Sequence, residues 1–192
     1  MIQNNNPEEL QEQYAQASPF PHISIDNFLE EEQLIRFAQQ LLEEQFFEKY
    51  ADLFHFYQTN DISSIPSLKE LHSFLSTELK EFVQKLTNIP LGEQVDAQGS
   101  IYADSNYLLC HDDQLEGRAV AFILYLSEVS SGGELCLYQS KEKVPTRENK
   151  ITIAPKPNRL VLFTVSDKSF HEVREVTCDE QRIAIGGWFH HA

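Results

Sequence analysis

The chain has 192 residues, of which 41% are hydrophobic and 11% aromatic, and it carries a formal net charge of -15 at pH 7. This length allows one domain with a substantial core and is too short for two comfortable ones. So acidic a surface repels phosphate backbones, which argues against direct nucleic-acid binding, whereas a basic peptide or protein would be attracted.

The composition also bears on the compartment. No apolar run is long enough to span a membrane, and the polar start from Met1 to Asn6 lacks the basic and apolar parts of a signal peptide. The three cysteines, Cys110, Cys136 and Cys178, are an odd number at unrelated spacings, which argues against a disulfide framework. We therefore expect a cytoplasmic protein with no membrane association.

The first half of the chain predicts one strand followed by helices. The segment from His22 to Asp26 alternates between polar and apolar residues and predicts a strand, with Asp26 also a candidate helix cap. Apolar residues then recur at helical spacing from Leu34 to Leu42 within a charged sequence. This pattern is typical of an amphipathic helix whose apolar stripe is buried.

A second helix is predicted before Pro90. Ser67-Leu68-Lys69-Glu70 has the form of a capping box after Pro66, and Pro90 stops the pattern. Six large apolar side chains form one stripe between these limits: Leu68, Leu71, Leu75, Leu79, Phe82 and Leu86. Residues 1–92 are therefore expected to form an N-terminal lead-in and supporting helices.

After Gly92 the pattern changes to period two and short β-rich runs. Helices followed by strands predict an α+β fold in which the N-terminal helices pack on one face of an antiparallel sheet. We expect a single domain over residues 1–192, in which the β-rich core at 93–192 carries the chemistry.

The segment from Leu108 to Tyr125 places a histidine and an aspartate directly before its most apolar run. In an extended strand residues i and i+2 point to the same side, so His111 and Asp113 would present an imidazole and a carboxylate together. The best candidate for a third metal ligand is His171, after the β-rich run that ends at Val165. Two histidines and one carboxylate leave open coordination positions, as in non-haem iron(II) oxygenases.

The His-x-Asp pattern alone is short enough to occur by chance, so a structural reading competes with the metal site. Arg182 changes that balance. It opens an apolar strand in which Ala184, Gly186 and Trp188 share its face. An arginine on so apolar a strand is costly to bury unless it meets a carboxylate. Together with the two histidines and the aspartate, this arginine favours a functional site.

At these residues the chain resembles the 2-oxoglutarate- and iron(II)-dependent dioxygenases. More narrowly, it is similar to the catalytic domain of the prolyl 3-hydroxylases that modify a small-subunit ribosomal protein in yeast and animals. The resemblance spans nearly the whole chain. It rests on Phe20-Pro21-His22, LLCHDD at 108–113, Glu116-Gly117-Arg118, AFILYL at 121–126, Gly132-Gly133 with Leu135, Ser169-Phe170-His171 and Gly187-Trp188-Phe189-His190.

The resemblance implies a fold and a set of cofactors. The fold would be a double-stranded β-helix, a jelly-roll or cupin-like barrel whose mouth holds the metal. The expected metal ligands and catalytic residues are His111, Asp113 and His171. The cofactors would be Fe(II), 2-oxoglutarate and O2, with ascorbate as a stimulant.

The residues that would bind the cosubstrate follow from the same resemblance. It implies that Arg182 holds the far carboxylate of 2-oxoglutarate together with the hydroxyl of Tyr125, and that Tyr102 contacts the cosubstrate near the metal. Many members of the superfamily have a serine two residues after the arginine, whereas this chain has Ala184, which places more of that role on Tyr125. A packed core side chain is the alternative for each tyrosine, and also for Trp188, which could instead wall the substrate pocket.

The implied function is hydroxylation of a prolyl residue in a protein, with a basic small-subunit ribosomal protein as the favoured substrate and with release of succinate and CO2. The same chemistry on another protein, such as a translation factor, or on a small molecule is one alternative. A non-catalytic binding module of the same fold is another. Eukaryotic members carry a second, metal-free domain, whereas this sequence stops at Ala192, so we do not expect recruitment of substrate by such a domain.

Overall fold

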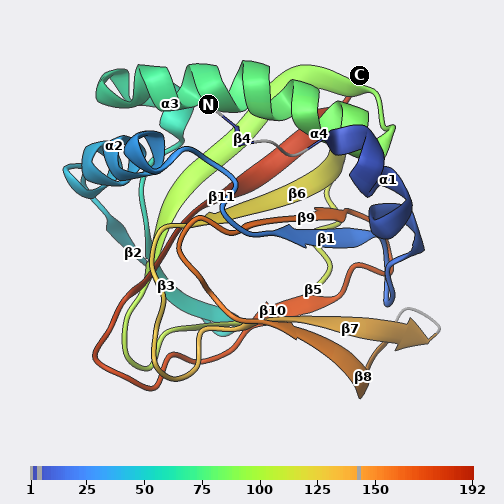
Figure 1. Ribbon diagram of the computed structural model, residues 1–192. Helices are drawn as coiled ribbons and strands as arrows, with labels where there is room; N and C mark the ends of the chain where they lie inside the picture. The colour runs from blue at the N-terminus through green and yellow to red at the C-terminus, as the bar shows by residue number, and fades with distance from the viewer. Residues whose placement is uncertain (1, 4–5, 142–143) are drawn as a thin grey trace.

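The computed structural model describes residues 2–3, 6–141 and 144–192 (Figure 1). Its strands are β1 (His22–Ile25), β2 (Phe47–Ala51), β3 (Phe54–Gln58), β4 (Leu91–Tyr102), β5 (Tyr107–His111), β6 (Arg118–Tyr125), β7 (Leu135–Lys141), β8 (Val144–Ile153), β9 (Leu160–Thr164), β10 (His171–Val173) and β11 (Arg182–His191). Within the described residues these eleven strands form one sheet in the order β1-β9-β6-β11-β4-β3-β5-β10-β7-β8, with β2 paired to β3.

Helices cover one face of this sheet. They are α1 (Pro7–Gln16), α2 (Glu31–Leu42), α3 (Lys69–Phe74) and α4 (Lys80–Thr87). The 3-10 turns η1 (Ile62–Ser64) and η2 (Pro66–Leu68) precede α3, and the π turn η3 (Leu75–Leu79) lies between α3 and α4. No helix in the described part of the chain is both long and apolar enough to cross a membrane.

The sheet curls into two facing halves. Figure 1 shows the helices above the half formed by β1, β9, β6, β11 and β4, with β5, β10, β7 and β8 below it. Strand β3 joins the halves, because Gln58 pairs with Ser100 of β4 while Phe54 pairs with Leu108 of β5. Antiparallel strands in two facing layers match the predicted double-stranded β-helix, and the helices on one sheet match the predicted α+β arrangement.

The continuous apolar run of β6 is explained by burial on both faces. Val120 and Leu124 belong to the core cluster that also contains the buried residues of the helices. Ala121 and Tyr125 alternate with them and belong to a second cluster, which draws residues from both halves of the sheet. A strand covered by helices on one side and by the facing sheet on the other has no polar face.

The predicted helices are present, but both predicted caps are wrong. The α2 helix has Glu30 at its N-cap, whereas Asp26 binds Arg159 and Lys156 with N–O distances of 2.6 and 2.8 Å. Ser67 donates its hydroxyl hydrogen bond to Glu44 instead of capping a helix. All six residues of the predicted stripe from Leu68 to Leu86 are buried.

The expected order of helices first and strands afterwards is also wrong in part. Strand β1 was predicted, but β2 and β3 also lie before residue 92, and the β2–β3 hairpin between α2 and η1 had no counterpart in the prediction. Its alternation is weak because aromatic residues occupy both faces of β3, among them Phe54, Phe56 and Tyr57. The N-terminal segment therefore contributes part of the sheet as well as the helices that support it.

Candidate active site

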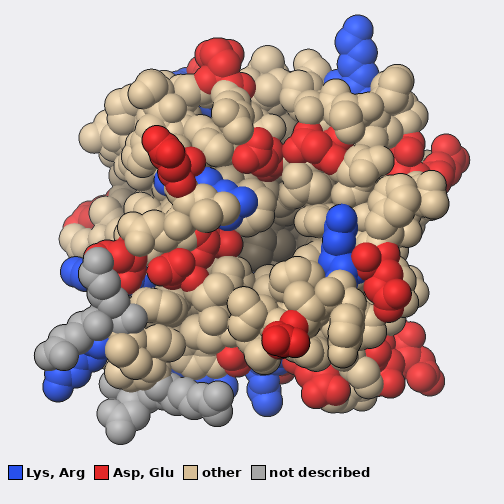
Figure 2. Space-filling view, turned by 180° about the vertical axis from the view of Figure 1, so that it is seen from behind, with Lys and Arg blue, Asp and Glu red and all other residues tan. Residues whose placement is uncertain are grey.

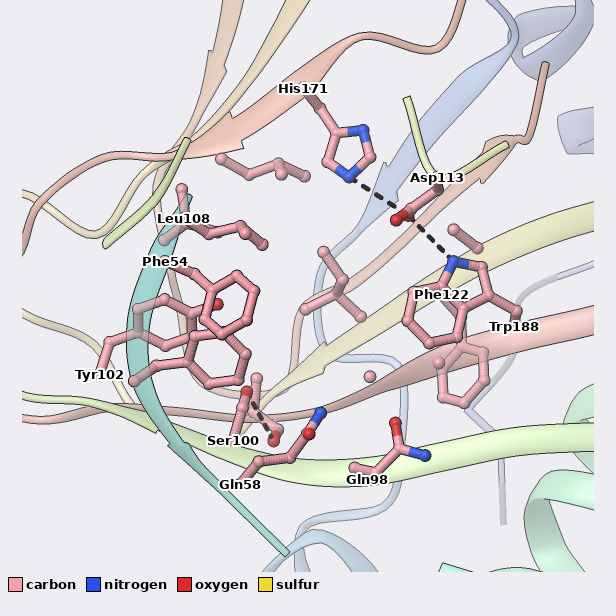
Figure 3. Close-up of a pocket in the computed structure, with 18 of the residues that line it drawn as sticks. Phe54, Gln58, Gln98, Ser100, Tyr102, Leu108, Asp113, Phe122, His171 and Trp188 are labelled. Carbon is pink, nitrogen blue, oxygen red and sulfur yellow. Dashed lines mark hydrogen bonds and ion pairs between the residues drawn. The ribbon is translucent and has the colours of Figure 1, made fainter. Parts of the chain in front are cut away.

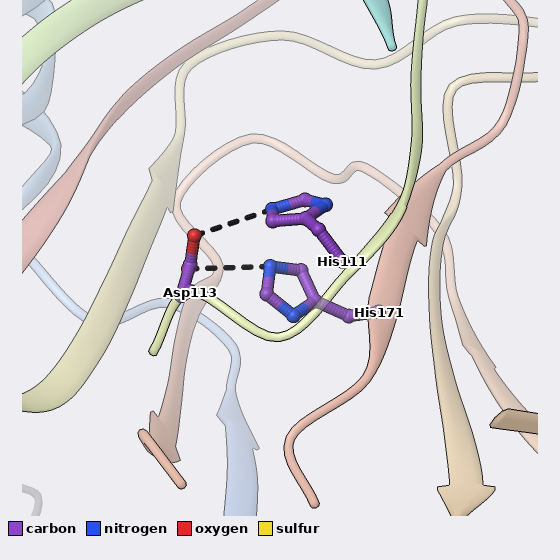
Figure 4. Close-up of side chains that lie close together, drawn as sticks. All are labelled: His111, Asp113 and His171. Carbon is purple, nitrogen blue, oxygen red and sulfur yellow. Dashed lines mark ion pairs between the residues drawn. The ribbon is translucent and has the colours of Figure 1, made fainter. Parts of the chain in front are cut away.

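Two histidines and one aspartate converge at the mouth of the curled sheet. His111 ends β5 and His171 begins β10, and the two are register partners in this antiparallel pair. Nε2 of His111 lies 3.2 Å from Oδ1 of Asp113, and Nε2 of His171 lies 3.3 Å from Oδ2 (Figure 4). The three candidate ligand atoms lie within 4.8 Å of one another. The structure thus brings together the three side chains that the sequence singled out.

The backbone reaches this arrangement by a route that the sequence analysis did not predict. Strand β5 ends at His111, and Asp113 lies beyond it with φ +61°, in the left-handed region. His111 and Asp113 do present their side chains together, but the expected reason, that they share one face of an extended strand, is wrong. Asp adopts this conformation more readily than most residues, and a hydrogen bond of 2.8 Å from the Leu115 amide to the Asp113 carbonyl holds the turn.

The second nitrogen of each imidazole defines which tautomer is present. Nδ1 of His111 lies 2.8 Å from the carbonyl oxygen of Leu109, and Nδ1 of His171 lies 2.7 Å from that of Ser169. A carbonyl only accepts, so each Nδ1 carries a proton, and each Nε2 either shares a proton with Asp113 or, once deprotonated, presents a lone pair on that side. Two lone pairs and a carboxylate that face one point suit a divalent cation.

Electrostatics keep the carboxylate ionised. Burial by itself would raise the pKa of Asp113, but the charge of His171 and the hydrogen bonds from both histidines hold it well below its usual range. Burial also opposes protonation of His111, yet its hydrogen bond to Asp113 and the charge of that carboxylate raise the pKa of this histidine. An ionised carboxylate between two imidazoles is the state that binds a metal ion.

A buried cation lies in the same cavity. Arg182 is 2% exposed, and its Nη2 donates to the hydroxyl of Tyr125 at 3.3 Å. Its Cζ lies 4.8 and 4.9 Å from the ring centroids of Tyr102 and Tyr125. Its Nε has no hydrogen-bond partner, and no carboxylate forms an ion pair with it among the described residues. A buried guanidinium without an anion is costly, so this end of the cavity suits an anionic ligand.

The metal cluster and the arginine line one cavity of about 260 Å³. Figure 3 shows His171 and Asp113 at one end, with Gln58, Gln98 and Ser100 on the opposite side. Ala184 and Gly186 line it between Arg182 and Trp188, as their shared strand face predicted. Figure 2, which views the molecule from behind relative to Figure 1, shows a hollow near the centre of this face, with both acidic and basic side chains around it.

The hairpin that the sequence analysis missed forms one wall of this cavity. Phe54, Phe56 and Gln58 of β3 all line it, and the Phe56 ring stacks on that of Tyr102 with centroids 4.9 Å apart. The metal cluster and Arg182 do come from 93–192, as expected, whereas this wall comes from the N-terminal segment, which was expected only to support the core. The alternation of β3 was the available signal, but its mixed aromatic faces obscured it.

Trp188 was interpreted from the sequence as a pocket wall or a packed core side chain, and neither interpretation predicted its direct contact with a candidate metal ligand. Its Nε1 donates to Oδ2 of Asp113 at 2.9 Å, so it contacts the candidate metal ligand as well as lining the cavity (Figure 3). The guanidinium of Arg118 stacks on its ring, with Cζ 3.4 Å from the centroid. Arg118 was part of the resemblance but had no assigned role.

Residues 97–190 match the family described as the 2OG-Fe(II) oxygenase superfamily. This range contains the three candidate metal ligands and Arg182. The chain therefore carries a domain of the 2OG-Fe(II) oxygenase superfamily, in agreement with its fold and with the residues of the site.

Characterised relatives narrow the comparison. The chain is 36% identical over 179 residues to prolyl 3-hydroxylase OGFOD1 of Mus musculus, a match over 90% of this chain and 33% of the relative. It is 36% identical over 188 residues to prolyl 3-hydroxylase sudestada1 of Drosophila melanogaster, over 91% of this chain and 35% of the relative. The chain thus spans about a third of the length of these relatives.

The solved structures establish the fold independently. A prolyl-4-hydroxylase from Pseudomonas putida superposes with a TM-score of 0.76 over 97% of this chain and 100% of the other, at 16% sequence identity. At so low an identity the likeness bears on the fold alone, and it confirms the predicted double-stranded β-helix.

Proposed function

We propose that this chain is a 2-oxoglutarate- and Fe(II)-dependent dioxygenase that hydroxylates a prolyl residue in a protein. The proposal rests on one observation: a cluster of His111, Asp113 and His171 shares a cavity with Arg182, a buried cation without a carboxylate partner. A divalent metal ion would be bound by the cluster, and a dicarboxylate would neutralise the charge of Arg182. The similarity to prolyl 3-hydroxylases supports the choice of reaction.

The side chains divide the work between metal and cosubstrate. His111, Asp113 and His171 would hold Fe(II), and Arg182 with the hydroxyl of Tyr125 would hold the far carboxylate of 2-oxoglutarate. When bound, Fe(II), 2-oxoglutarate and O2 supply an oxidative decarboxylation that yields succinate and CO2 and inserts oxygen into a C–H bond. Ascorbate is expected to stimulate turnover.

The remaining walls exclude water and leave space. Aromatic and aliphatic side chains such as Phe56, Leu108 and Val173 line the cavity, which strengthens the charge interactions at Arg182. Tyr102 lies over the guanidinium, and burial raises the pKa of its hydroxyl, so it remains a neutral neighbour for an anion. Small residues at 184 and 186 leave room for a short dicarboxylate beside Arg182.

The substrate we propose is a basic protein, with a small-subunit ribosomal protein as first choice. The net charge of -15 favours a basic partner through long-range attraction and disfavours direct contact with nucleic acid. A ribosomal substrate is consistent with action in the cytoplasm by one domain over residues 1–192. Another protein, such as a translation factor, or a small molecule would use the same site.

The decisive test joins the reaction to the residue. Ribosomal proteins from cells with and without the gene would be compared by mass spectrometry for one added oxygen on proline. A peptide around the modified position should then stimulate succinate formation, and stimulation should weaken as salt rises because exposed charges are screened. Equal stimulation by the proline-to-alanine peptide would rule out prolyl hydroxylation. A protein that binds neither Fe(II) nor 2-oxoglutarate would be a non-catalytic module.

A further inference from the structure

Asp113 receives a hydrogen bond from a residue that is not a candidate metal ligand. The indole Nε1 of Trp188 donates to Oδ2 of Asp113 at 2.9 Å, from the face of β11 that also carries Arg182. An indole N–H only donates and cannot bind a metal. It can therefore fix the plane of the carboxylate without competing for the cation.

Arg118 holds both members of this pair. The loop that leaves Asp113 turns at Gly117, where φ is +86°, and enters β6 at Arg118. The guanidinium then lies flat on the indole, with Cζ 3.4 Å from the ring centroid, and its Nη1 lies 3.4 Å from the Asp113 carbonyl oxygen and 3.7 Å from Oδ1. The Arg118 side chain is 15% exposed, so these contacts are largely shielded from water.

These contacts supply what the backbone of Asp113 does not. The residue lies past the end of β5 in a left-handed conformation, so the backbone pairing of β5 does not fix the direction of its side chain. Its carboxylate faces two imidazole nitrogens that accept rather than donate in their neutral form. Trp188 is the neutral donor that orients it, and Arg118 orients Trp188.

We propose that Trp188 and Arg118 are positioning residues that hold the Asp113 carboxylate toward Nε2 of His111 and His171 and so raise the affinity of the site for its divalent cation. This inference rests on the metal site of the proposed function and is independent of the cosubstrate and the substrate. Partners of this kind commonly contribute a factor of about 10–100 in metal affinity.

The sequence provides its own reporter for a test. Trp188 is the only tryptophan, so the tryptophan emission and the single indole N–H signal in a ¹⁵N-correlated spectrum both come from this position. Mn²⁺, a redox-stable divalent ion that carboxylate and imidazole bind, serves as the probe. Its binding to the whole chain is measured by calorimetry and, where Trp188 is kept, by quenching of its emission.

Three variants and one control separate positioning from folding. Trp188→Phe keeps a ring under Arg118 and removes only the donor, whereas Arg118→Met removes the stacked cation and Arg118→Lys keeps a charge without the planar contact. Arg36→Met removes an arginine on α2 that pairs with Glu70 at 3.1 Å, with both side chains about half exposed. Thermal unfolding of each metal-free variant identifies any that has lost its fold.

We expect the Mn²⁺ dissociation constant to rise about 10–100-fold in Trp188→Phe and Arg118→Met, less in Arg118→Lys, and not at all in Arg36→Met. The indole N–H should also exchange faster with solvent in Arg118→Met. Folded variants at 118 and 188 that bind Mn²⁺ as tightly as wild type would overturn the proposal and leave the metal site standing. Failure of the wild type to bind Mn²⁺ would remove the metal site itself, and the positioning role with it.

Discussion

Nη2 of Arg182 lies 3.3 Å from the hydroxyl oxygen of Tyr125, in a pair that is almost completely buried. The hydroxyl offers one acceptor to a group with five donors, and the Nε of the same guanidinium has none. The pair therefore leaves a positive charge that an incoming carboxylate can neutralise.

Removal of that charge should affect the cosubstrate more than the metal. Breaking a buried charge pair commonly costs about 3–5 kcal/mol, so Arg182→Ala should weaken 2-oxoglutarate binding by orders of magnitude while Fe(II) binding persists. Tyr125→Phe loses one neutral donor and should cost about 1 kcal/mol. Anaerobic titration of the Fe(II) protein, followed by the visible charge-transfer band of the chelate, measures both. An unchanged titration for Arg182→Ala would make this arginine structural.

Each of the three candidate ligands should be required for turnover. Alanine at His111, Asp113 or His171 removes one donor from the cluster and should abolish Fe(II)-dependent succinate formation while circular dichroism remains that of the folded protein. His55→Ala, at a histidine of β3 that pairs with Glu48 at 2.9 Å, is the matched control and should retain activity. Activity in a metal-stripped and reconstituted His171→Ala protein would contradict the assignment.

An ion pair remote from the cavity predicts a dependence of stability on pH. Arg159 and Lys156 lower the pKa of Asp26 from its ordinary value of 3.8 to about 2. A lowered folded-state pKa stabilises the fold above 3.8, and this contribution is lost as the pH falls through about 2. Because the pair is partly exposed, the contribution is at most about 1 kcal/mol.

Urea unfolding of Asp26→Asn at pH values from about 2 to about 6, a range that spans both pKa values, tests this. We expect the variant to be less stable than wild type at the upper end and the difference to shrink toward the acid end. Asp52→Asn, an exposed aspartate at the β2–β3 turn, serves as control. A difference for Asp26→Asn that stayed constant over the range would show that its charge is not the cause.

Two adjacent glycines in β11 should respond oppositely to one added methyl group. A Cβ at Gly187 would lie 1.8 Å from the Asp96 carbonyl oxygen, so Gly187→Ala forces β4 and β11 apart. A Cβ at Gly186 would meet nothing closer than 3.5 Å, so Gly186→Ala should fold. Its methyl group would instead narrow the cavity that Gly186 lines.

Thermal unfolding and cosubstrate titration together distinguish these effects. Gly187→Ala should lower the unfolding midpoint by several degrees, since overpacking costs about 1–3 kcal/mol and one kcal/mol shifts the midpoint by roughly 2–4 °C at this size. Gly186→Ala should keep the midpoint and weaken 2-oxoglutarate or peptide binding. The reverse result would contradict the assignment of the close contact to position 187 and of the free space to position 186.

The sequence could predict the site largely because its residues lie in recognisable patterns. His111, Asp113, His171 and Arg182 stand next to or within strongly apolar strands, where polar side chains are conspicuous. The left-handed turn at Asp113 was not predictable, since it depends on the loop hydrogen bonds that close around it. A strand-period argument thus brought together two side chains that do lie close in the structure, but through a backbone conformation that the chain does not adopt.

The fold was predictable where burial is local and periodic. The apolar stripe of the second helix is buried as expected, although the π turn at η3 adjusts its spacing. The β2–β3 hairpin was not predicted because β3 pairs with β4 and β5, partners more than thirty residues away along the chain. Trp188 was ambiguous for a similar reason, since its acceptor Asp113 comes from a distant loop.

Strand β3 couples ligand binding in the cavity to the strand pairing that joins the two halves of the sheet. It is hydrogen-bonded to β4 through Gln58 and to β5 through Phe54, and the side chains of both residues line the cavity. A ligand bound in the cavity would therefore contact β3, which is the only strand that links the two halves within the described residues. Bound ligand should therefore slow the opening of the β2–β3 hairpin. Amide hydrogen exchange in β2 and β3 would then report the fraction of the protein that has ligand in its cavity.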